Sequence, residues 1–395
     1  MKILIITQHY WPEIFRVTDI AESLVDLGHD VTVLCGLPNY PKGYVFEEYK
    51  RNKNRIEEHN NVKIIRAKEI GRRKGTIFRL LNYWSYPYFA GKLVRKLERD
   101  FNVVFTPMTS PIMMSKPAIK YAKRSKKKIV MYEMDLWPES LLAGGISRKS
   151  MIYKHYKNIS SRIYSKCDKI LVSTKEHINY INNLPNCNGL SIEYLPQYAD
   201  TLFEKTTLRH TNNGIIDLMF AGNIGKAQSI VTIIKAASIL KDNNRFVFHI
   251  VGDGSELETN KKIANELNLK NVIFYGQKPL EEMPKLYEFA DVMLVTLENK
   301  EYANMTIPGK VQSYMAVGKP VVGAINGSGS DFIKNNKIGF VCNAEDYEGL
   351  ANIIANLDYN ELLKIGEHAK KVYFEKYSKK IFMNTLVSNL EKYSQ

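Results

Sequence analysis

The sequence predicts an α/β protein of two consecutive Rossmann-like domains, each built on a doubly wound parallel sheet. At 395 residues the chain is too long for one ordinary hydrophobic core and suits two domains of about 200 residues each. Short apolar runs alternate with helical stretches, which is the pattern of parallel βαβ units. The alternation begins again after the middle of the chain without repeating the first half's sequence, so we expect a second domain of the same class.

The first half supplies the elements of one such domain in order. An apolar strand at residues 2–7 is too short for a signal peptide. A helix at 18–27 follows, and Gly28 turns the chain into the next strand. Further strands are expected at the apolar runs 31–34, 62–65, 103–106, 128–131 and 170–173.

The second half repeats this alternation. A strand at 217–221 precedes a helix at 229–240, and later strands are expected at 245–251, 272–275, 292–295 and 320–322. Beyond residue 361 the chain is helical and polar. We therefore expect a first domain at 1–199, a second at 200–375, and a C-terminal helix at 376–395 that returns to the first domain.

The composition is that of a soluble globular protein, with 45% hydrophobic and 25% charged residues. The four cysteines lie far apart, with no CxxC pair and no histidine at ligand spacing. This argues against a disulfide framework or a structural zinc site and fits a reducing cytoplasm. No window approaches about 18 consecutive apolar residues, so no membrane-spanning helix is expected.

The net charge of +15 is concentrated in one part of the chain. Residues 42–128 contain 23 Lys or Arg and 7 Asp or Glu, whereas the remainder contains 33 and 34. Within this window, Arg72, Arg73, Lys74 and Arg79 are interleaved with Phe78, Tyr83 and Trp84. Basic and aromatic side chains together favour an anionic membrane surface. The alternative is a solvated basic face beside ordinary core aromatics, and no known motif supports a nucleic-acid partner.

The segment Thr306–Val322 contains the clearest candidate site. It predicts a loop closed by Pro308 and Gly309, a short helix that starts at Lys310, and a buried strand. A lysine in the first turn weakens the helix but strengthens an anion site, because unpaired N–H groups point the same way. We therefore expect a phosphate clamp, with a solvated lysine at a helix start as the alternative.

A second anion site is expected where the first strand of the second domain ends. Gly222, Asn223, Gly225 and Lys226 follow that strand and precede a helix, which suits a diphosphate cradle. The alternative is an ordinary βα turn. Gly252, Asp253 and Gly254 follow the next strand, and Gln277 follows the one after it; Asp253 has an alternative role as a helix N-cap.

Several function classes are disfavoured by missing motifs. Neither domain has G-x-G-x-x-G after its first strand, and no G-x-x-x-x-G-K-[ST] is present, which argues against a dinucleotide oxidoreductase and a P-loop enzyme. A metal-dependent sugar transferase would use D-x-D, and Glu133-Met134-Asp135 is only a weak approach to it. We expect no metal and no cofactor.

Three loops of the first domain are expected at the carboxyl edge of its sheet. The loop at 8–16 carries His9 and Arg16, the loop at 36–43 is rich in Pro and Tyr, and the loop at 132–140 carries Asp135. Such loops are suited to contact a substrate. For the aromatic residues Trp11 and Phe15 the alternative is that they only cover the core.

Taken in order, these segments resemble the GT-B glycosyltransferases of family 4, and most of all the bacterial O-antigen and capsule enzymes that transfer N-acetyl-L-fucosamine. The resemblance extends from the first strand to about residue 320 and is carried by Q-H-Y-W-P-E-I-F-R, G-H-D-V-T-V-L, P-N-Y-P-K-G, D-L-W-P-E-S, A-G-N-I-G-K-A-Q and P-G-K-V-Q-S-Y-M-A-V-G-K-P. It implies two domains that face each other across a cleft.

The resemblance also implies the roles of the site residues. A UDP-sugar is expected on the second domain, with Lys226 and Lys310 neutralising the diphosphate as it leaves. Arg16, His9 and Asp135 are expected to face the acceptor or the donor sugar. The nucleotide side of the site is expected at Gly222, Asn223, Gly252, Asp253, Gly254, Gln277, Pro308 and Gly309.

Transfer is expected to retain the anomeric configuration without a protein nucleophile, and the acceptor to be an undecaprenyl-diphosphate-linked saccharide. The expected location is cytoplasmic, peripherally bound to the inner face of the bacterial plasma membrane. Two positions depart from the family: Asn223 stands where many relatives have Arg, and Ser313 where a Glu usually grips the ribose. A UDP-sugar epimerase and a non-catalytic membrane- or polysaccharide-binding protein are the alternative functions.

Overall fold

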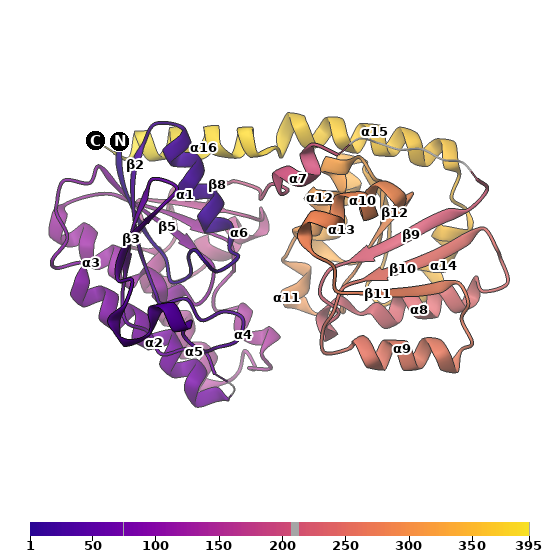
Figure 1. Cartoon of the computed structure of the whole chain (residues 1–395), viewed down its shortest axis with the longest axis horizontal. Helices are drawn as coiled ribbons and strands as arrows, with labels where there is room; N and C mark the ends of the chain where they lie inside the picture. The colour runs from indigo at the N-terminus through magenta and orange to yellow at the C-terminus, as the bar shows by residue number, and fades with distance from the viewer. Residues whose placement is uncertain (74, 207–212, 395) are drawn as a thin grey trace. The chain divides into compact units, whose positions relative to one another are not determined.

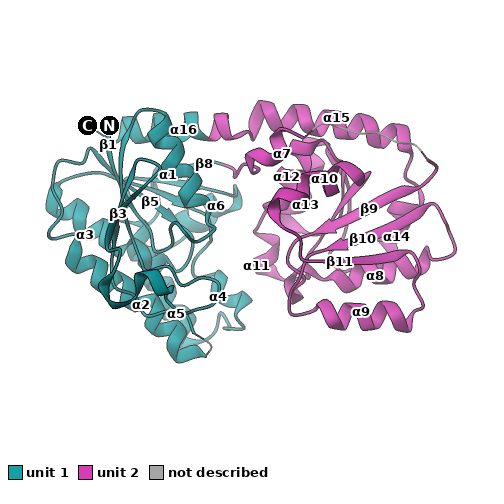
Figure 2. Cartoon of the chain, viewed as in Figure 1, with its two compact units in different colours: residues 1–195, 383–395 teal, residues 196–382 magenta. Residues whose placement is uncertain are grey.

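The computed structural model shows two compact units, each an α/β layer structure (Figures 1 and 2). It describes residues 1–73, 75–206 and 213–394. Unit 1 consists of Met1–Leu195 and Met383–Gln395, and unit 2 of Pro196–Phe382. The first boundary lies four residues before the expected one, and the return to unit 1 begins at residue 383 instead of 376.

Unit 1 is built on an eight-stranded sheet in the order β3-β4-β2-β1-β5-β6-β7-β8, parallel except for the β3–β4 pair. The central strands are apolar and fully buried, as expected for a sheet covered on both faces. The sequence did not predict β3 or β8, which lie at the two edges. The strands are β1 (Lys2–Ile6), β2 (Asp30–Cys35), β3 (Ile56–His59), β4 (Val62–Arg66), β5 (Val103–Met108), β6 (Ile129–Glu133), β7 (Lys169–Val172) and β8 (Ile192–Tyr194).

The helices of unit 1 connect these strands. Ser150 caps α5, because its side chain accepts a hydrogen bond from the backbone N–H of Tyr153. The helices are α1 (Arg16–Asp26), η1 (Glu47–Asn52), α2 (Thr76–Leu93), η2 (Ile112–Ser115), α3 (Lys116–Ser125), α4 (Ser140–Ala143), α5 (Met151–Tyr164) and α6 (Glu176–Asn182).

Unit 2 is built on a six-stranded, fully parallel sheet in the order β11-β10-β9-β12-β13-β14. The sequence did not predict the edge strand β14. The chain leaves β9 toward one edge of the sheet and later starts again at β12 on the other side of β9, so the β9–β12 boundary is a topological switch point. The strands are β9 (Ile216–Ala221), β10 (Phe246–Val251), β11 (Val272–Gly276), β12 (Val292–Thr296), β13 (Val321–Ala324) and β14 (Gly339–Cys342).

The core of unit 2 has two apolar layers, one on each face of the sheet. Helices α8 (Ile230–Ile239), α9 (Leu257–Glu266) and α14 (Tyr347–Ala355) pack on one face. The other face is covered by α7 (Thr201–Glu204), α10 (Met283–Phe289), α12 (Lys310–Val317), α13 (Gly327–Asn336) and α15 (Tyr359–Lys376). The remaining helices are η3 (Lys226–Gln228), η4 (Leu280–Glu282), α11 (Glu301–Asn304) and α16 (Lys379–Lys392).

The C-terminal part of the chain is two helices, α15 and α16, instead of one. Helix α16 crosses the unit boundary, and its residues from Met383 onward belong to unit 1. Tyr393 in the same segment donates a hydrogen bond to Ser191 of unit 1, at 3.3 Å. Among the described helices, none combines the length and apolar character needed to cross a bilayer.

Candidate functional site

The predicted diphosphate cradle is built mainly from backbone at the carboxyl ends of β9 and β10. Gly222 and Gly252 have φ angles of 139° and 140°, which favour glycine. A Cβ atom on Gly252 would lie 1.8 Å from the carbonyl oxygen of Gly222, and one on Gly254 would lie 2.4 Å from that of Ile224. Glycine is therefore required because two backbone segments are in direct contact.

Backbone hydrogen bonds join the loops that follow three neighbouring strands. Gly222 N–H donates to the Val251 carbonyl at 2.9 Å, and Ile224 N–H donates to the Asp253 carbonyl at 2.8 Å. Gly252 N–H in turn donates to the Gly276 carbonyl at 2.9 Å. The ends of β9, β10 and β11 therefore form one continuous surface at the sheet edge where open α/β folds bind ligands.

Lys310 brings a cation to this surface. It is the first residue of α12, and its Nζ lies 3.7 Å from the ring centre of Phe220 on β9. The same atom is 3.0 Å from the place where a Cβ on Gly222 would stand. Burial lowers the pKa of Lys310 to about 7, and within the described ranges no carboxylate forms an ion pair with it. Lys310 is thus a cation at the end of β9 that lacks a protein counter-charge.

Lys226 is an exposed cation on the adjoining turn. It begins η3 and forms no ion pair with any residue that the structure describes. The turn itself is held by Gln228, whose side-chain oxygen accepts hydrogen bonds from the Asn223 amide at 3.1 Å and from Gly225 N–H at 3.2 Å. The Gln228 carbonyl accepts a hydrogen bond from Thr296 at the end of β12. The turn is therefore fixed across the topological switch point.

The other predicted nucleotide residues lie at the same edge of the sheet. Asp253 is exposed and accepts a hydrogen bond from Gly254 N–H at 2.7 Å. It does not cap α9, whose N-cap is Glu256, so the alternative N-cap role is wrong. Gln277 is exposed just after β11. The Pro308 carbonyl accepts from Val311 N–H at 3.0 Å, which closes the turn through Gly309 into α12.

Two polar groups in this region were missed from the sequence. Gln312 in the first turn of α12 and Ser328 at the start of α13 are buried. Within the described residues, Gln312 Oε1 and Ser328 Oγ have no hydrogen-bond partner. Pro308 lies next to Gly329, which brings the two helix starts close together. No sequence motif marks these two groups. They stand out only because they are buried and have no hydrogen-bond partner among the described residues, which the sequence does not reveal.

In unit 1, His9 is held by a buried carboxylate. Its Nδ1 lies 2.8 Å from Glu13 Oε2, and its ring stacks on Phe15 with ring centres 4.6 Å apart. The other oxygen of Glu13 accepts the backbone N–H groups of Asn39 and Tyr40, both at 2.7 Å. Burial alone would lower the pKa of His9, but the hydrogen bond and charge of Glu13 raise it overall. The loops after β1 and β2 are thereby fixed to each other.

A buried carboxylate that the sequence did not reveal lies beside this pair. Glu69 Oε1 accepts hydrogen bonds from the side-chain amides of Gln8 at 2.8 Å, Asn39 at 3.1 Å and Asn82 at 2.6 Å. Burial raises the pKa of Glu69 to about 7. Its other oxygen is packed so closely that a Cβ on Gly36 would lie 1.8 Å from it. Glu69 therefore joins four segments that are distant in sequence.

Arg16 and Asp135 lie on elements at the same edge of the unit 1 sheet. Arg16 begins α1 and is close enough to Tyr132 on β6 for its charge to oppose the burial that raises the pKa of that phenol. Asp135 follows β6 and accepts a hydrogen bond from Ser140. Burial raises the pKa of Asp135 to about 6. His9 and Arg16 thus follow β1, and Asp135 follows β6.

The weak acidic motif does not form a metal site among the described residues. The Glu133 side chain is buried and lies 2.7 Å from His177 Nδ1, whereas Asp135 bonds to Ser140. In the described parts of the chain no group of three or more His, Cys, Asp or Glu is arranged to hold a metal ion. The predicted catalytic residues thus form two sets, with Lys226 and Lys310 in unit 2 and His9, Arg16 and Asp135 in unit 1.

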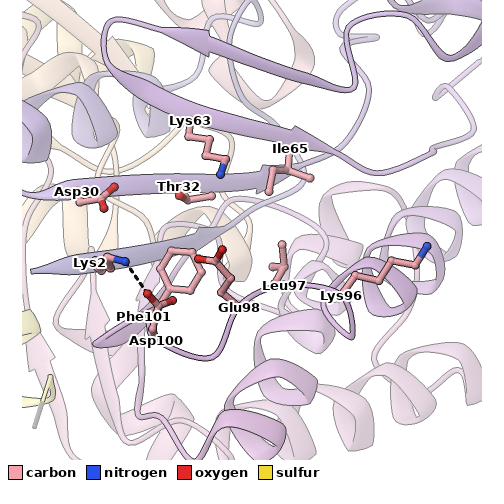
Figure 3. A pocket seen from close by; sticks show the side chains of 10 residues that line it. All are labelled: Lys2, Asp30, Thr32, Lys63, Ile65, Lys96, Leu97, Glu98, Asp100 and Phe101. Carbon is pink, nitrogen blue, oxygen red and sulfur yellow. Dashed lines mark hydrogen bonds and ion pairs between the residues drawn. The ribbon is translucent and has the colours of Figure 1, made fainter.

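A cavity of about 350 Å³ lies at the opposite, amino-terminal edge of the unit 1 sheet (Figure 3). Lys2 and Asp30, the first residues of β1 and β2, line it together with Lys63 of β4. Lys2 forms an ion pair with Asp100 at its rim. The lining has both charge signs and contains none of the predicted site residues, so this cavity is separate from the candidate site.

Comparison with known proteins gives a family match for the second unit. Residues 204–379 match the family model described as "Glycosyl transferases group 1". Most of unit 2 is thus similar to a glycosyltransferase domain. The glycine loops, Lys226 and Lys310 all lie within the matched residues, so the candidate cradle belongs to this domain.

Relatives extend the similarity into unit 1. The chain is 26% identical over 305 residues to the probable glycosyltransferase WbjE of Pseudomonas aeruginosa, covering 74% of this chain and 75% of the relative. It is also 26% identical over 341 residues to the putative colanic acid biosynthesis glycosyl transferase WcaI of Escherichia coli K12, covering 80% and 82%. The similarity supports a glycosyltransferase and does not identify the sugar.

Solved structures confirm the predicted GT-B fold. Anabaena Alr3699/HepE in complex with UDP and glucose superposes with a TM-score of 0.69 and 14% identity, covering 99% of each chain. Sucrose-phosphate synthase of Thermosynechococcus elongatus gives a TM-score of 0.73 and 14% identity, covering 99% of this chain and 98% of the other. At this identity the likeness shows the fold alone.

Proposed function

We propose that the protein is a metal-independent, retaining glycosyltransferase of family 4 that uses a UDP-sugar donor. The observation that carries the proposal is Lys310, a cation at the end of β9 with no ion-pair partner in the described chain, set against the glycine cradle. A site that is electropositive and built from backbone N–H groups fits a diphosphate. The complexes of Anabaena Alr3699/HepE with UDP and with UDP-glucose support a nucleotide-sugar donor.

In the proposed reaction, the bond between the sugar's anomeric carbon and the diphosphate breaks while the acceptor hydroxyl attacks the same face. The departing phosphate takes the hydroxyl proton, so no protein nucleophile is needed. Lys310 and Lys226 stabilise the charge that develops on the diphosphate. Gly222, Asn223 and the loop from Gly252 to Gly254 line the nucleotide, with Gln277 near the uracil.

The proposed acceptor is an undecaprenyl-diphosphate-linked saccharide, and the proposed sugar is N-acetyl-L-fucosamine. The product would be part of a capsule or O-antigen polysaccharide, which agrees with the colanic acid biosynthesis named for the WcaI relative. His9, Arg16 and Asp135 would contact the acceptor or the donor sugar. Because such an acceptor is embedded in lipid, the enzyme would work in the cytoplasm at the inner face of the plasma membrane.

Ribose recognition would differ from that of many relatives. Ser313, partly exposed in α12, stands where a glutamate usually binds the ribose. A serine hydroxyl can donate or accept only through a short side chain, so it would reach the ribose less directly than a carboxylate. We therefore propose that the affinity of this chain for the nucleotide depends more on contacts with the diphosphate than on contacts with the ribose.

The test is incubation of the protein with a panel of UDP-sugars, with and without a lipid-diphosphate saccharide, followed by mass spectrometry. A product heavier than the acceptor by one sugar residue, formed with one UDP-sugar and lost in Lys310→Met, is the expected result. Isomerised UDP-sugar formed without an acceptor would establish an epimerase instead. No transfer and no UDP binding would leave a non-catalytic protein and overturn the proposal.

A further inference from the structure

Helix α2 of unit 1 exposes more large apolar side chains than an ordinary surface helix does. Its buried residues are Asn82, Tyr83, Ser85, Tyr86, Pro87, Ala90 and Gly91. The large apolar side chains that are exposed recur at helical spacing and thus share one face. They are Ile77, Leu80, Leu81, Trp84 and Tyr88. Water does not favour so many large apolar side chains on one exposed helix face.

A second helix beside α2 also exposes apolar side chains. Trp84 Nε1 on α2 donates to the Tyr156 hydroxyl on α5 at 3.4 Å, so the two helices are neighbours (Figure 1). At the start of α5, Met151 and Ile152 are 78% and 52% exposed. We call the exposed apolar residues of α2 together with Met151 and Ile152 the α2–α5 face. Exposed apolar side chains on two neighbouring helices mark a candidate interaction surface.

The charge around the α2–α5 face has a single sign in the sequence. Residues 70–97 contain seven Lys or Arg and residues 140–167 contain six, and neither segment contains Asp or Glu. Two lysines lie directly over the exposed rings: Lys116 Nζ is 4.1 Å from the ring centre of Trp84, and Lys92 Nζ is 4.2 Å from that of Tyr88. The face therefore combines apolar groups, amphipathic rings and cations within one surface.

We propose that the α2–α5 face binds the surface of an anionic lipid bilayer. Apolar side chains and Trp would enter the headgroup boundary while Lys and Arg contact lipid phosphates. Protein interfaces are electrostatically complementary, so a face that binds a protein usually carries both positive and negative residues at its rim. The all-basic surround favours lipid, and a second copy of this equally basic chain would be repelled.

The residues that the structure assigns to the membrane-binding face differ from those expected from the sequence. Tyr83, expected at the membrane, is buried and packs edge-on against Trp137 with ring centres 5.8 Å apart, so that prediction is wrong. Phe78 is partly covered by the Arg73 guanidinium, 5.3 Å from its ring centre. Lys74 lies outside the described residues. Ile77, Leu80, Leu81, Met151 and Ile152 join instead, and periodicity read from the segment alone did not single them out.

The proposal gives the proposed transferase its location, and it can be tested without any sugar transfer. The probes are sedimentation with vesicles of phosphatidylglycerol and phosphatidylcholine, and with vesicles of phosphatidylcholine alone. The apolar variant is Ile77→Gln/Leu80→Gln/Leu81→Gln. Its matched control is Ile239→Gln/Leu267→Gln/Leu280→Gln, which removes three apolar side chains of unit 2 that are also exposed.

A charge variant, Arg73→Gln/Lys92→Gln/Lys154→Gln, is paired with the unit 2 control Lys241→Gln/Lys270→Gln/Lys334→Gln. All six residues are exposed. Each charge removed near an anionic surface is expected to weaken binding by about fivefold at low salt. We expect at least tenfold weaker vesicle binding for the apolar and charge variants and wild-type binding for both controls. The deficit of the charge variant should shrink at high salt, whereas that of the apolar variant should persist.

Circular dichroism and UDP binding establish that each variant is folded. If both variants bind phosphatidylglycerol vesicles as tightly as wild type, the proposal is wrong. It is equally wrong if vesicle binding is unchanged while the apolar variant converts a dimer into a monomer in sedimentation velocity, since the face would then contact a second copy. Vesicle binding that persists in a protein without transferase activity would keep this proposal and remove only the proposed function.

Discussion

The candidate binding edges of the two units are built from different parts of the chain. In unit 2 the candidate cradle is made mainly of backbone, with glycines in contact and N–H groups that donate from one loop to the next. Lys226 and Lys310 add side-chain cations to it. In unit 1 the corresponding sheet edge is held together by side chains. The buried carboxylates of Glu13 and Glu69 fix the loops through hydrogen bonds with amides and a histidine. A site that recognises an invariant diphosphate can be built from backbone, whereas a site for a variable sugar or acceptor depends on replaceable side chains.

The largest effect should come from disturbing the backbone contact itself. In Gly252→Ala the new Cβ would meet the Gly222 carbonyl, and alanine would be strained at a φ of 140°. We expect loss of UDP binding and a free energy of unfolding lowered by roughly 2–6 kcal/mol. Calorimetric UDP titration and denaturant unfolding measure the two effects.

Gly28→Ala is the control for that change, because Gly28 also has a positive φ but has open space around it. It should lower the free energy of unfolding by only about 1–2 kcal/mol and leave UDP binding unchanged. Equal losses in the two variants would mean that backbone strain, and not the contact between loops, determines the effect.

The second effect concerns the cations of the cradle. Lys310→Met keeps the apolar stem, and Lys226→Ala removes an exposed side chain; each should lower kcat by at least about tenfold to a hundredfold. The fold should survive in both, as judged by thermal unfolding. Lys241→Ala, at an exposed position elsewhere in unit 2, is the matched control. Wild-type turnover in either cradle variant would exclude that lysine from a phosphate clamp.

The third prediction uses the lowered pKa of Lys310, which is about 7 in the unliganded protein because of burial. A bound diphosphate favours the charged form, so binding above pH 7 must add a proton to Lys310. UDP affinity should therefore fall as pH rises above about 7, by at most tenfold per pH unit. Titrations in buffers of different ionisation enthalpy should show proton uptake, and Lys310→Met should abolish both effects.

The fourth prediction tests the side-chain network of unit 1. Glu69→Ala would leave the amides of Gln8, Asn39 and Asn82 without their shared acceptor and should lower the free energy of unfolding by about 1–3 kcal/mol. Transfer to the acceptor should weaken while UDP binding stays at the wild-type level. If Glu69→Ala weakened UDP binding as much as transfer, the candidate sites of unit 1 and unit 2 would not be independent, and the contrast drawn between them would be wrong.

Glu69 also predicts a pH dependence of stability. Burial raises its pKa from 4.5 to about 7, so between these values the folded protein binds the proton that the unfolded chain releases. The contribution of Glu69 to stability is fully present below pH 4.5 and is lost as pH rises through about 7. Glu69→Gln should flatten this part of the stability profile, which unfolding measured across that range would reveal.

The smallest effect should come from removing metal. Because the proposed site neutralises phosphate with lysines and N–H groups, EDTA should leave the transfer rate nearly unchanged. Complete loss of activity on chelation, with recovery on adding Mg²⁺ or Mn²⁺, would contradict a metal-independent cradle and would make Asp135 a candidate ligand.

The same difference explains what the sequence could predict. Glycine and lysine after an apolar run are local signals, so the cradle around Gly222, the loop at Gly252 and the helix start at Lys310 were all expected. Glu69 accepts hydrogen bonds from three other segments, at Gln8, Asn39 and Asn82, and nothing local distinguishes it from a solvated glutamate. Edge strands β3 and β14 are short and only partly buried, so their patterns were too weak to recognise. The exposed apolar face of α2 could be recognised only once the exposure of each side chain was known.

The boundary inside α16 has a consequence for how the protein is made. Met383, Leu386 and Leu390 are buried, and the segment from Met383 onward belongs to unit 1. A ribosome therefore releases residues 1–195 well before the helix that completes their core exists, and all of unit 2 is translated in between. During synthesis unit 2 can close first, while unit 1 waits with an uncovered apolar strip. That interval is when chaperones would be most needed.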